Sequence, residues 1–313
     1  MSGGMVHEAT GRGTPRETDN PHDAPPAALG ELGKGRHVRV EATEDGAYEG
    51  YCHAGRAANR SYGGAVLAQA LDAAHRTVDE DRVVHSLHAY FLRALSPQRP
   101  VRFTPEVVRD GRSYSMRQVT GVQDGKESLT MSVSFKQPQP GGSWRQPGMP
   151  DVPGPERLPN AWSHRPQDHP LRTSVEYREV PLERRPDGSR VDAGPADGGR
   201  IDRYAWMRTV GAMPDEPGPH ACVLAYICDS PLAPTALVAY GEPRPRGIAL
   251  ASLDHAMWFH RPARVDEWLL FACHSVVAGD GRTLARGEFW TGGGELVASV
   301  TQEALLHVSR GVS

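Results

Sequence analysis

Cysteine is scarce in this sequence, and its spacing does not fit a metal site. The 313 residues include four cysteines, at positions 52, 222, 228 and 273, and no Cys-x-x-Cys pair. Zinc and redox sites usually need such closely spaced pairs. His85 and His88 have no carboxylate or cysteine at a fitting spacing. We therefore expect no metal and no cofactor, and free thiols in a reducing, cytoplasmic compartment.

A strong net charge and long apolar segments are also absent. The formal net charge of −3 gives no sign of a nucleic-acid partner. No run of about 18 apolar residues occurs, so we expect no membrane span. Residues 1–30 lack the apolar core of a signal peptide, and the final Arg-Gly-Val-Ser is not a peroxisomal address.

Three common functional motifs are missing as well. The chain has no Gly-x-Ser-x-Gly, so the nucleophile elbow of the α/β-hydrolases is not supported. It also has no Gly-x-Gly-x-x-Gly and no Walker A sequence, which removes the usual signals for dinucleotide and nucleotide binding.

Proline and glycine are plentiful, but they cluster and divide the chain. Residues 1–36 are rich in Gly, Pro and charge, and we expect them to form a disordered N-terminal extension. Residues 139–200 contain further Pro/Gly-rich stretches and are predicted to be a poorly structured linker. Two denser segments remain, 37–138 and 201–311, and each is predicted to be one structural unit.

The two dense segments resemble each other in the order of their elements. Each has an apolar helical stretch, then a strand-like run, then an Asp-Gly-Arg-Ser/Thr turn, and each closes with an alternating strand. The paired ranges are 62–78 and 221–241, 83–95 and 247–263, 110–113 and 280–283, and 127–135 and 295–308. A helix wrapped by an antiparallel sheet is the hotdog layout, so the sequence predicts an α+β double hotdog.

Asp229 is the single charged residue between Ala221 and Tyr240. Burial of an ionised carboxylate is costly without partners. One interpretation is a helix cap, because Ser230 and Pro231 follow and proline is favoured at helix starts. The other is a catalytic carboxylate. Aligning the repeats places Asp229 opposite Gln69.

Polar side chains also occur on two strand faces that should be apolar. Two-residue alternation puts Ser252 on one face of strand 250–258 and Gln302 on one face of the last strand. The expected faces are Leu250, Ser252, Asp254, Ala256 and Trp258, and Val300, Gln302, Ala304, Leu306 and Val308. Asp229, Ser252 and Gln302 together could activate a water without a nucleophilic side chain, or they could form a buried polar cluster. Asp254 and His255 are adjacent, so they face opposite sides and form no simple dyad.

Several motifs in both dense segments carry a resemblance to a known family. They are YGGAVLAQAL (62–71), VVHSLHAYFLRA (83–94), RDGRSYSMRQV (109–119), SVSFKQP (132–138), LDHAMWFHRP (253–262), DEWLLF (266–271) and ARGEFWTGGGELVASVTQEALL (285–306). Taken together and in this order, they resemble the acyl-CoA thioesterase II family. The extension and the linker carry none of the resemblance.

The resemblance implies a double hotdog that hydrolyses fatty acyl-CoA to fatty acid and CoA, assembled as a homodimer or higher homo-oligomer. The family's catalytic Asp, Thr or Ser, and Gln fall on Asp229, Ser252 and Gln302. These side chains would orient and deprotonate a water that attacks the thioester, without an acyl-enzyme. Gly63 and Gly64 open the first helix, where backbone N–H groups could bind an oxyanion or substrate; close helix–sheet packing is the other interpretation.

Other functions stay open at this point. A hotdog hydratase would need a His beside the Asp, and Asp229 has no obvious His neighbour in sequence. A specialised thioesterase or acyltransferase would use the same site on another acyl thioester. A non-catalytic acyl-CoA-binding protein would not need the three polar residues.

Overall fold

A computed structural model describes residues 37–55, 59–141, 148–164, 171–181, 201–240 and 247–308, with Met1, Trp144 and His169. The predicted disordered extension therefore lies, apart from Met1, outside the described residues. Within the described ranges, the two predicted dense segments contain both long helices and nearly all of the strands.

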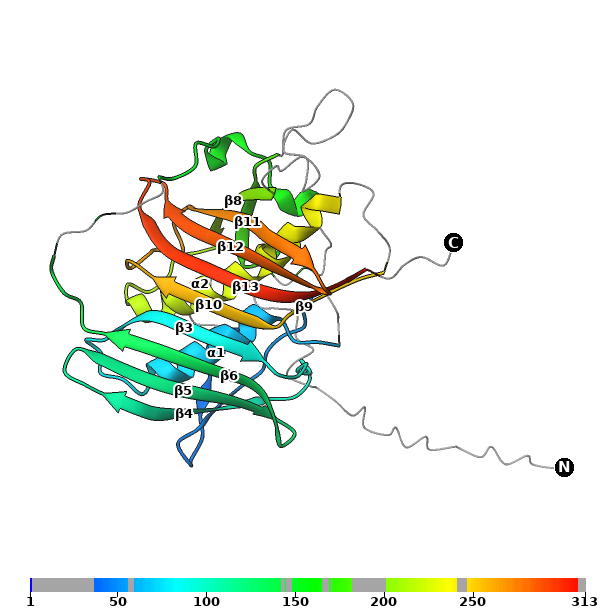
Figure 1. The fold of residues 1–313 in the computed structure, drawn as a ribbon. Coiled ribbons are helices and arrows are strands. Elements are labelled where there is room, and N and C mark those ends of the chain that lie inside the picture. The colour runs from blue at the N-terminus through cyan, green and yellow to red at the C-terminus, as the bar shows by residue number, and fades with distance from the viewer. Residues whose placement is uncertain are drawn as a thin grey trace, which may run out of the picture.

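One continuous antiparallel sheet joins the two halves of the chain (Figure 1). The first half contributes β1 (Glu41–Ala42), β2 (Tyr48–Gly50), β3 (Val83–Phe91), β4 (Val101–Asp110), β5 (Tyr114–Gln123) and β6 (Lys126–Lys136). The second contributes β7 (Val175–Glu179), β8 (Ile201–Thr209), β9 (Ile248–Ser252), β10 (Asp254–Phe259), β11 (Leu269–Gly279), β12 (Arg282–Thr291) and β13 (Leu296–Val308). Strand β3 pairs with β10 at the centre, and β9 pairs only with the end of β13.

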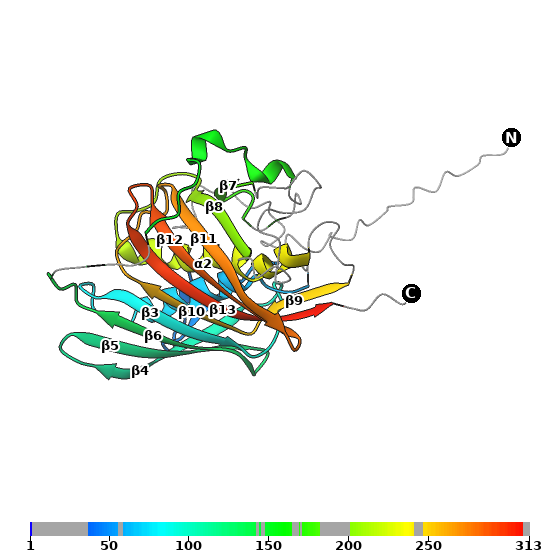
Figure 2. The same cartoon turned by 45° about the horizontal axis from the view of Figure 1, so that its top comes forward.

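Two helices, α1 (Gly63–His75) and α2 (Pro217–Leu232), lie together on the concave side of this sheet (Figures 1 and 2). Helix α1 is buried continuously from Gly64 to Ala74. A helix that is apolar on all sides must be enclosed by other elements, and the many alanines allow close packing against α2 and the sheet. Helix α2 continues into a 3-10 helix, η4 (Ala233–Tyr240). The predicted double hotdog is confirmed.

The repeated Asp-Gly-Arg sequence forms a hairpin in both halves, as predicted. Between β11 and β12, Asp280 and Gly281 have φ values of 50° and 73°. Two consecutive positive φ values define the two-residue turn that Asp-Gly favours, because its twist matches that of the strands. In the first half the turn is wider, since β4 ends at Asp110 and β5 starts at Tyr114.

Part of the predicted linker is built into the sheet. Strand β7 pairs with β8 at the sheet edge, and its Val175 and Tyr177 are buried. Two 3-10 turns, η1 (Pro155–Arg157) and η2 (Ala161–His164), precede it. Within 139–200 these elements are ordered, while 182–200 lie outside the described residues.

In the part of the chain that the structure describes, one helical segment, Pro217–Val238, has the length and composition to cross a membrane. Of its most apolar window, 83% is buried inside the protein. This segment is the core helix of the second half, and its apolar composition is accounted for by the sheet around it.

Candidate active site

Asp229 lies inside α2 and contacts the start of α1. The Gly64 N–H donates to Asp229 Oδ2 over 2.9 Å. Helix α1 has no side-chain cap of its own from Tyr62, so the carboxylate meets the positive end of a helix from across the core. The interpretation of Asp229 as the cap of its own helix is wrong, because α2 starts at Pro217 and continues through Pro231.

Ser252 is the last residue of β9, and the strand is broken at Leu253, between β9 and β10. Ser252 is opposite Ala304 in β13, whereas Ala256 of β10 is opposite Thr301. The break at Leu253 therefore changes which side chains face inward. Ser252 and His255 share the inner face, and the predicted common face of Leu250, Ser252, Asp254, Ala256 and Trp258 is wrong beyond Ser252. The alternation rule fails because it assumes an unbroken strand.

Gln302 lies on the inner face of β13, as predicted. Val300, Gln302, Ala304 and Leu306 are all buried, while the side chain of Val308 is outside the described ones. Gln302 Nε2 donates to Asp229 Oδ1 over 2.8 Å and to Ser252 Oγ over 2.6 Å. Ser252 Oγ donates to the same Asp229 oxygen over 3.3 Å. The structure thus brings the three predicted residues into one hydrogen-bonded cluster.

The Asp229 carboxyl is a perturbed group. Burial raises its pKa above the ordinary value, and the hydrogen bonds from its three partners oppose that rise. No positively charged side chain acts among these causes. A buried carboxylate held by neutral donors is a stronger base than a solvated one, while its partners still support the ionised form.

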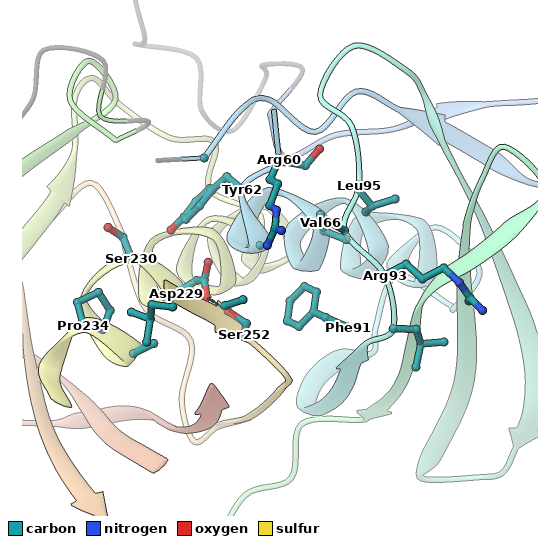
Figure 3. A pocket seen from close by; sticks show the side chains of 18 of the residues that line it. Arg60, Tyr62, Val66, Phe91, Arg93, Leu95, Asp229, Ser230, Pro234 and Ser252 are labelled. Atoms are coloured by element: carbon teal, nitrogen blue, oxygen red, sulfur yellow. Dashed lines mark hydrogen bonds between the residues drawn. The ribbon is translucent and has the colours of Figure 1, made fainter. Parts of the chain in front are cut away.

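A cavity of about 320 Å³ opens beside Asp229 and Ser252. Figure 3 shows the two polar side chains on one side and the apolar Val66, Phe91 and Leu95 on the other. The Arg60 guanidinium extends toward the middle of the cavity, and the Arg93 side chain lies farther from Asp229, past Phe91 (Figure 3). An apolar cavity with a few converging polar groups is the usual form of a small-molecule site.

The two glycines at the start of α1 allow α2 and the Asp229 side chain to lie close to this helix. A Cβ at Gly63 would lie 2.9 Å from Asp229 Oδ2, and one at Gly64 would lie 2.2 Å from the Tyr226 carbonyl oxygen. The packing interpretation of these glycines therefore holds. Gly63 also lines the cavity, whereas the Gly64 N–H is already donated to Asp229.

At the opposite end of the α1–α2 pair, His75 occupies the place that Asp229 has at the candidate active site. A Cβ at Gly218 would collide with His75 Nε2, just as one at Gly63 would meet Asp229. His75, rather than Gln69, is thus the counterpart of Asp229, and Gln69 instead bonds Cys52 and the Tyr51 carbonyl. The cavity of about 240 Å³ beside His75 has no carboxylate among its described lining residues. Of the two cavities, the one at the Asp229 end has a carboxylate in its described lining.

Sequence reasoning missed several residues of the site. Tyr62 lines the cavity and donates its hydroxyl to the Tyr226 carbonyl over 2.7 Å. His169, from the range predicted as a linker, also lines the cavity and contacts Ser230 Oγ. A tyrosine before the paired glycines was a visible signal for the first, but nothing local distinguished the second.

The other sequence candidates do not form a second chemical site. Asp254 Oδ1 accepts the Glu303 N–H over 2.6 Å, whereas His255 Nε2 contacts Cys228 Sγ at 3.2 Å. Their separation confirms the prediction that they form no dyad. Over the described ranges, no group of three or more His, Cys, Asp or Glu side chains could hold a metal ion.

The fold and the site define a class of protein: a hotdog protein with a buried carboxylate, hydroxyl and amide at an apolar cavity. Residues 53–136 and 151–306 match the profiles of the acyl-CoA thioesterase N-terminal and C-terminal domains. The chain therefore belongs to the acyl-CoA thioesterase family, and the resemblance seen in the sequence is confirmed.

Individual relatives agree with this assignment. Human acyl-coenzyme A thioesterase 8 is 36% identical over 276 residues, covering 82% of this chain and 83% of the relative. Acyl-CoA thioesterase 2 of Haemophilus influenzae is 32% identical, with 79% and 88% covered. The crystal structure of acyl-CoA thioesterase II TesB2 from Mycobacterium marinum is 38% identical, has a TM-score of 0.73, and covers 89% of this chain and 98% of that one. Hydrolysis of acyl-CoA thioesters is the activity that these findings support.

Proposed function

We propose that the chain hydrolyses fatty acyl-CoA by direct attack of a water that Asp229 deprotonates. The observation that carries the proposal is the Asp229–Ser252–Gln302 cluster at the wall of the cavity. The hydratase alternative lacks support, because no histidine hydrogen-bonds Asp229 in the described part of the chain.

In this mechanism Asp229 acts first as a base and then as an acid. Asp229 takes a proton from water while the water oxygen attacks the thioester carbonyl carbon, which gives a tetrahedral oxyanion. Collapse breaks the C–S bond, the CoA thiolate leaves, and the proton on Asp229 returns to the departing sulfur. Ser252, which lines the cavity, holds the water. Gln302 is fully buried and acts through Asp229 and Ser252.

The start of α1 supplies the oxyanion donors in this proposal. The Gly63 and Gly64 N–H groups lie at the positive end of the helix, where developing negative charge is stabilised. Because Asp229 already accepts from Gly64, the Gly63 N–H, beside the cavity, is the first donor that an oxyanion would meet. Gly64 would join it only if Asp229 shifted.

The test of the function is release of free thiol from acyl-CoAs of graded chain length. The proposal predicts turnover with fatty acyl-CoA and a preference set by the apolar cavity wall. Binding of acyl-CoA without thiol release would instead establish a non-catalytic binding protein. Turnover restricted to an unrelated acyl thioester would establish the specialised alternative.

Two substitutions at Ser252, one without and one with a hydroxyl, test the role of this side chain. We expect Ser252→Ala to lower kcat by about 10-fold, because one hydrogen bond to the reacting water is lost. Ser252→Thr should stay within about 3-fold of the wild type, because it keeps the hydroxyl. Steady-state kinetics on one acyl-CoA checks both variants. An unchanged kcat in Ser252→Ala would show that the Ser252 hydroxyl has no catalytic role.

Arg60 allows a prediction about CoA recognition. Its guanidinium points into the cavity (Figure 3), and such groups bind phosphates well. We expect Arg60→Ala to raise KM for acyl-CoA by about 10-fold, but to leave KM unchanged for the matching acyl-pantetheine, which lacks phosphates. Arg102→Ala is the matched control, because Arg102 pairs with Asp45 on the surface. Equal effects on both substrates would contradict a phosphate role.

We also propose a cytoplasmic homo-oligomer. The four cysteines are all buried free thiols, which fits a reducing compartment. Large apolar side chains are exposed on both halves, including Tyr90, Val107, Trp258 and Val277, and association would cover such surface. Light scattering of the purified chain tests the assembly, and a monomer at all concentrations would contradict it.

A further inference from the structure

The Gln302 amide has a well-defined orientation but leaves one atom unexplained. Its Nε2 donates to both Asp229 Oδ1 and Ser252 Oγ. Its Oε1 must therefore point away from the carboxylate, and this oxygen is buried without a partner of good hydrogen-bond geometry in the described structure. A buried acceptor of this kind is costly unless a donor lies nearby.

His255 is the side chain in the right place. The register that pairs Ala256 with Thr301 puts His255 opposite Gln302 on the next strand. Both side chains are fully buried, and His255 Nδ1 is a second buried atom without a well-placed partner among the described residues. Burial lowers the pKa of His255 to about 3, and the Gln302 side chain opposes this through hydrogen bonding. The imidazole is therefore neutral and in reach of Gln302.

The orientation of the Gln302 amide selects one tautomer of His255. An amide oxygen can only accept, so His255 must present Nδ1–H to Gln302. The other nitrogen, Nε2, must then accept, and Cys228 Sγ lies 3.2 Å from it. Burial raises the pKa of Cys228 well above its ordinary value, so the thiol keeps its proton, which it can donate either to His255 Nε2 or to the Ala225 carbonyl, 3.2 Å from the same sulfur. The inferred tautomer thus has Nδ1–H toward Gln302 and an unprotonated Nε2 toward Cys228.

We propose that His255 is a positioning residue for hydrolysis. Its Nδ1–H holds Oε1 of Gln302, which keeps the two Nε2 protons directed at Asp229 and Ser252. His255 touches neither substrate nor water and acts through the amide alone. The inference rests on the proposed mechanism, because it assigns a support for the same cluster.

Kinetics of a small set of variants tests the proposal. We expect His255→Leu to lower kcat by about 10-fold with KM within 2-fold, because one orienting hydrogen bond is lost. His255→Asn should recover most of kcat, because its amide N–H can replace Nδ1–H. In a Gln302→Ala background, His255→Leu should cause no further loss. Full additivity, or an Asn variant as poor as the Leu variant, would overturn the proposal.

Nitrogen-15 NMR of the wild-type enzyme gives a readout that is independent of activity. The His255 signals, assigned by their absence in His255→Asn, should show the Nδ1–H tautomer from pH 5 to 8. An Nε2–H tautomer would overturn the inference even in an active enzyme. A wild type that releases no thiol while His255 shows Nδ1–H would refute the proposed function alone.

Discussion

Asp229→Asn is expected to lower kcat for acyl-CoA hydrolysis by about 10²-fold or more, since loss of a general base typically costs this much. The substitution keeps the size of the side chain, but an amide cannot take the proton from water. The measurement is thiol release under saturating substrate, with circular dichroism to show that the fold is intact.

A matched control separates this effect from loss of buried charge in general. Asp254 is half-buried, its pKa is also raised by burial, and it accepts a backbone N–H from Glu303 outside the cluster. We expect Asp254→Asn to stay within about 3-fold of the wild-type kcat. Near-wild-type activity of Asp229→Asn would show that Asp229 is only a structural partner of Gly64.

The pH dependence of the wild type follows from the same residue. A general base works only when ionised, so activity should fall as the pH falls through the pKa of Asp229. Because burial raises that pKa, the loss should begin at a higher pH than for a solvated aspartate. In Asp229→Asn this limb of the kcat profile should disappear.

Gly64→Ala is expected to have the largest effect on stability. Alanine would gain up to about 1 kcal/mol from helix propensity. The added Cβ, however, would lie 2.2 Å from the Tyr226 carbonyl oxygen, which belongs to the backbone of α2 and cannot move aside. Overpacking typically costs about 1–3 kcal/mol and occasionally more, and contact with rigid backbone puts this clash at the upper end, so it outweighs the gain. Denaturant unfolding should show a lower midpoint, together with lost activity.

Gly63→Ala is the informative neighbour of that variant. Here the added Cβ meets the end of the Asp229 side chain at 2.9 Å, and a side chain can shift. We expect kcat to fall by about 10-fold, because Asp229 is displaced from its partners, while the free energy of unfolding changes by less than about 1 kcal/mol. Equal destabilisation by both variants would contradict this distinction.

Much of the fold could be predicted from the sequence because its signals are local and repeated. The apolar run around Leu67 predicted an enclosed helix, and Asp280-Gly281 predicted a hairpin. The alternation around Gln302 placed its side chain on the buried face, as observed. These features depend on neighbours in sequence, so a single chain is enough to reveal them.

The parts that could not be predicted depend on contacts between distant segments. The break at Leu253 turns His255 rather than Asp254 to the inner face, and no local pattern announces it. Asp229 and His75 occupy equivalent positions in the two halves because of how the two helices cross. The sequence alignment of Asp229 with Gln69 was therefore wrong. Strand β7 and His169 lie in a Pro/Gly-rich range whose composition hid their packing against the second half.

The central claim is that water, rather than Asp229, attacks the thioester. A single turnover with enzyme in excess over acyl-CoA, in water enriched in oxygen-18, tests it most directly, with mass spectrometry of the fatty acid and of the peptide that contains Asp229. General-base catalysis predicts one oxygen-18 in the fatty acid from the first turnover and none in the peptide. An unlabelled fatty acid with oxygen-18 in Asp229 would instead show a covalent acyl-enzyme and contradict the mechanism.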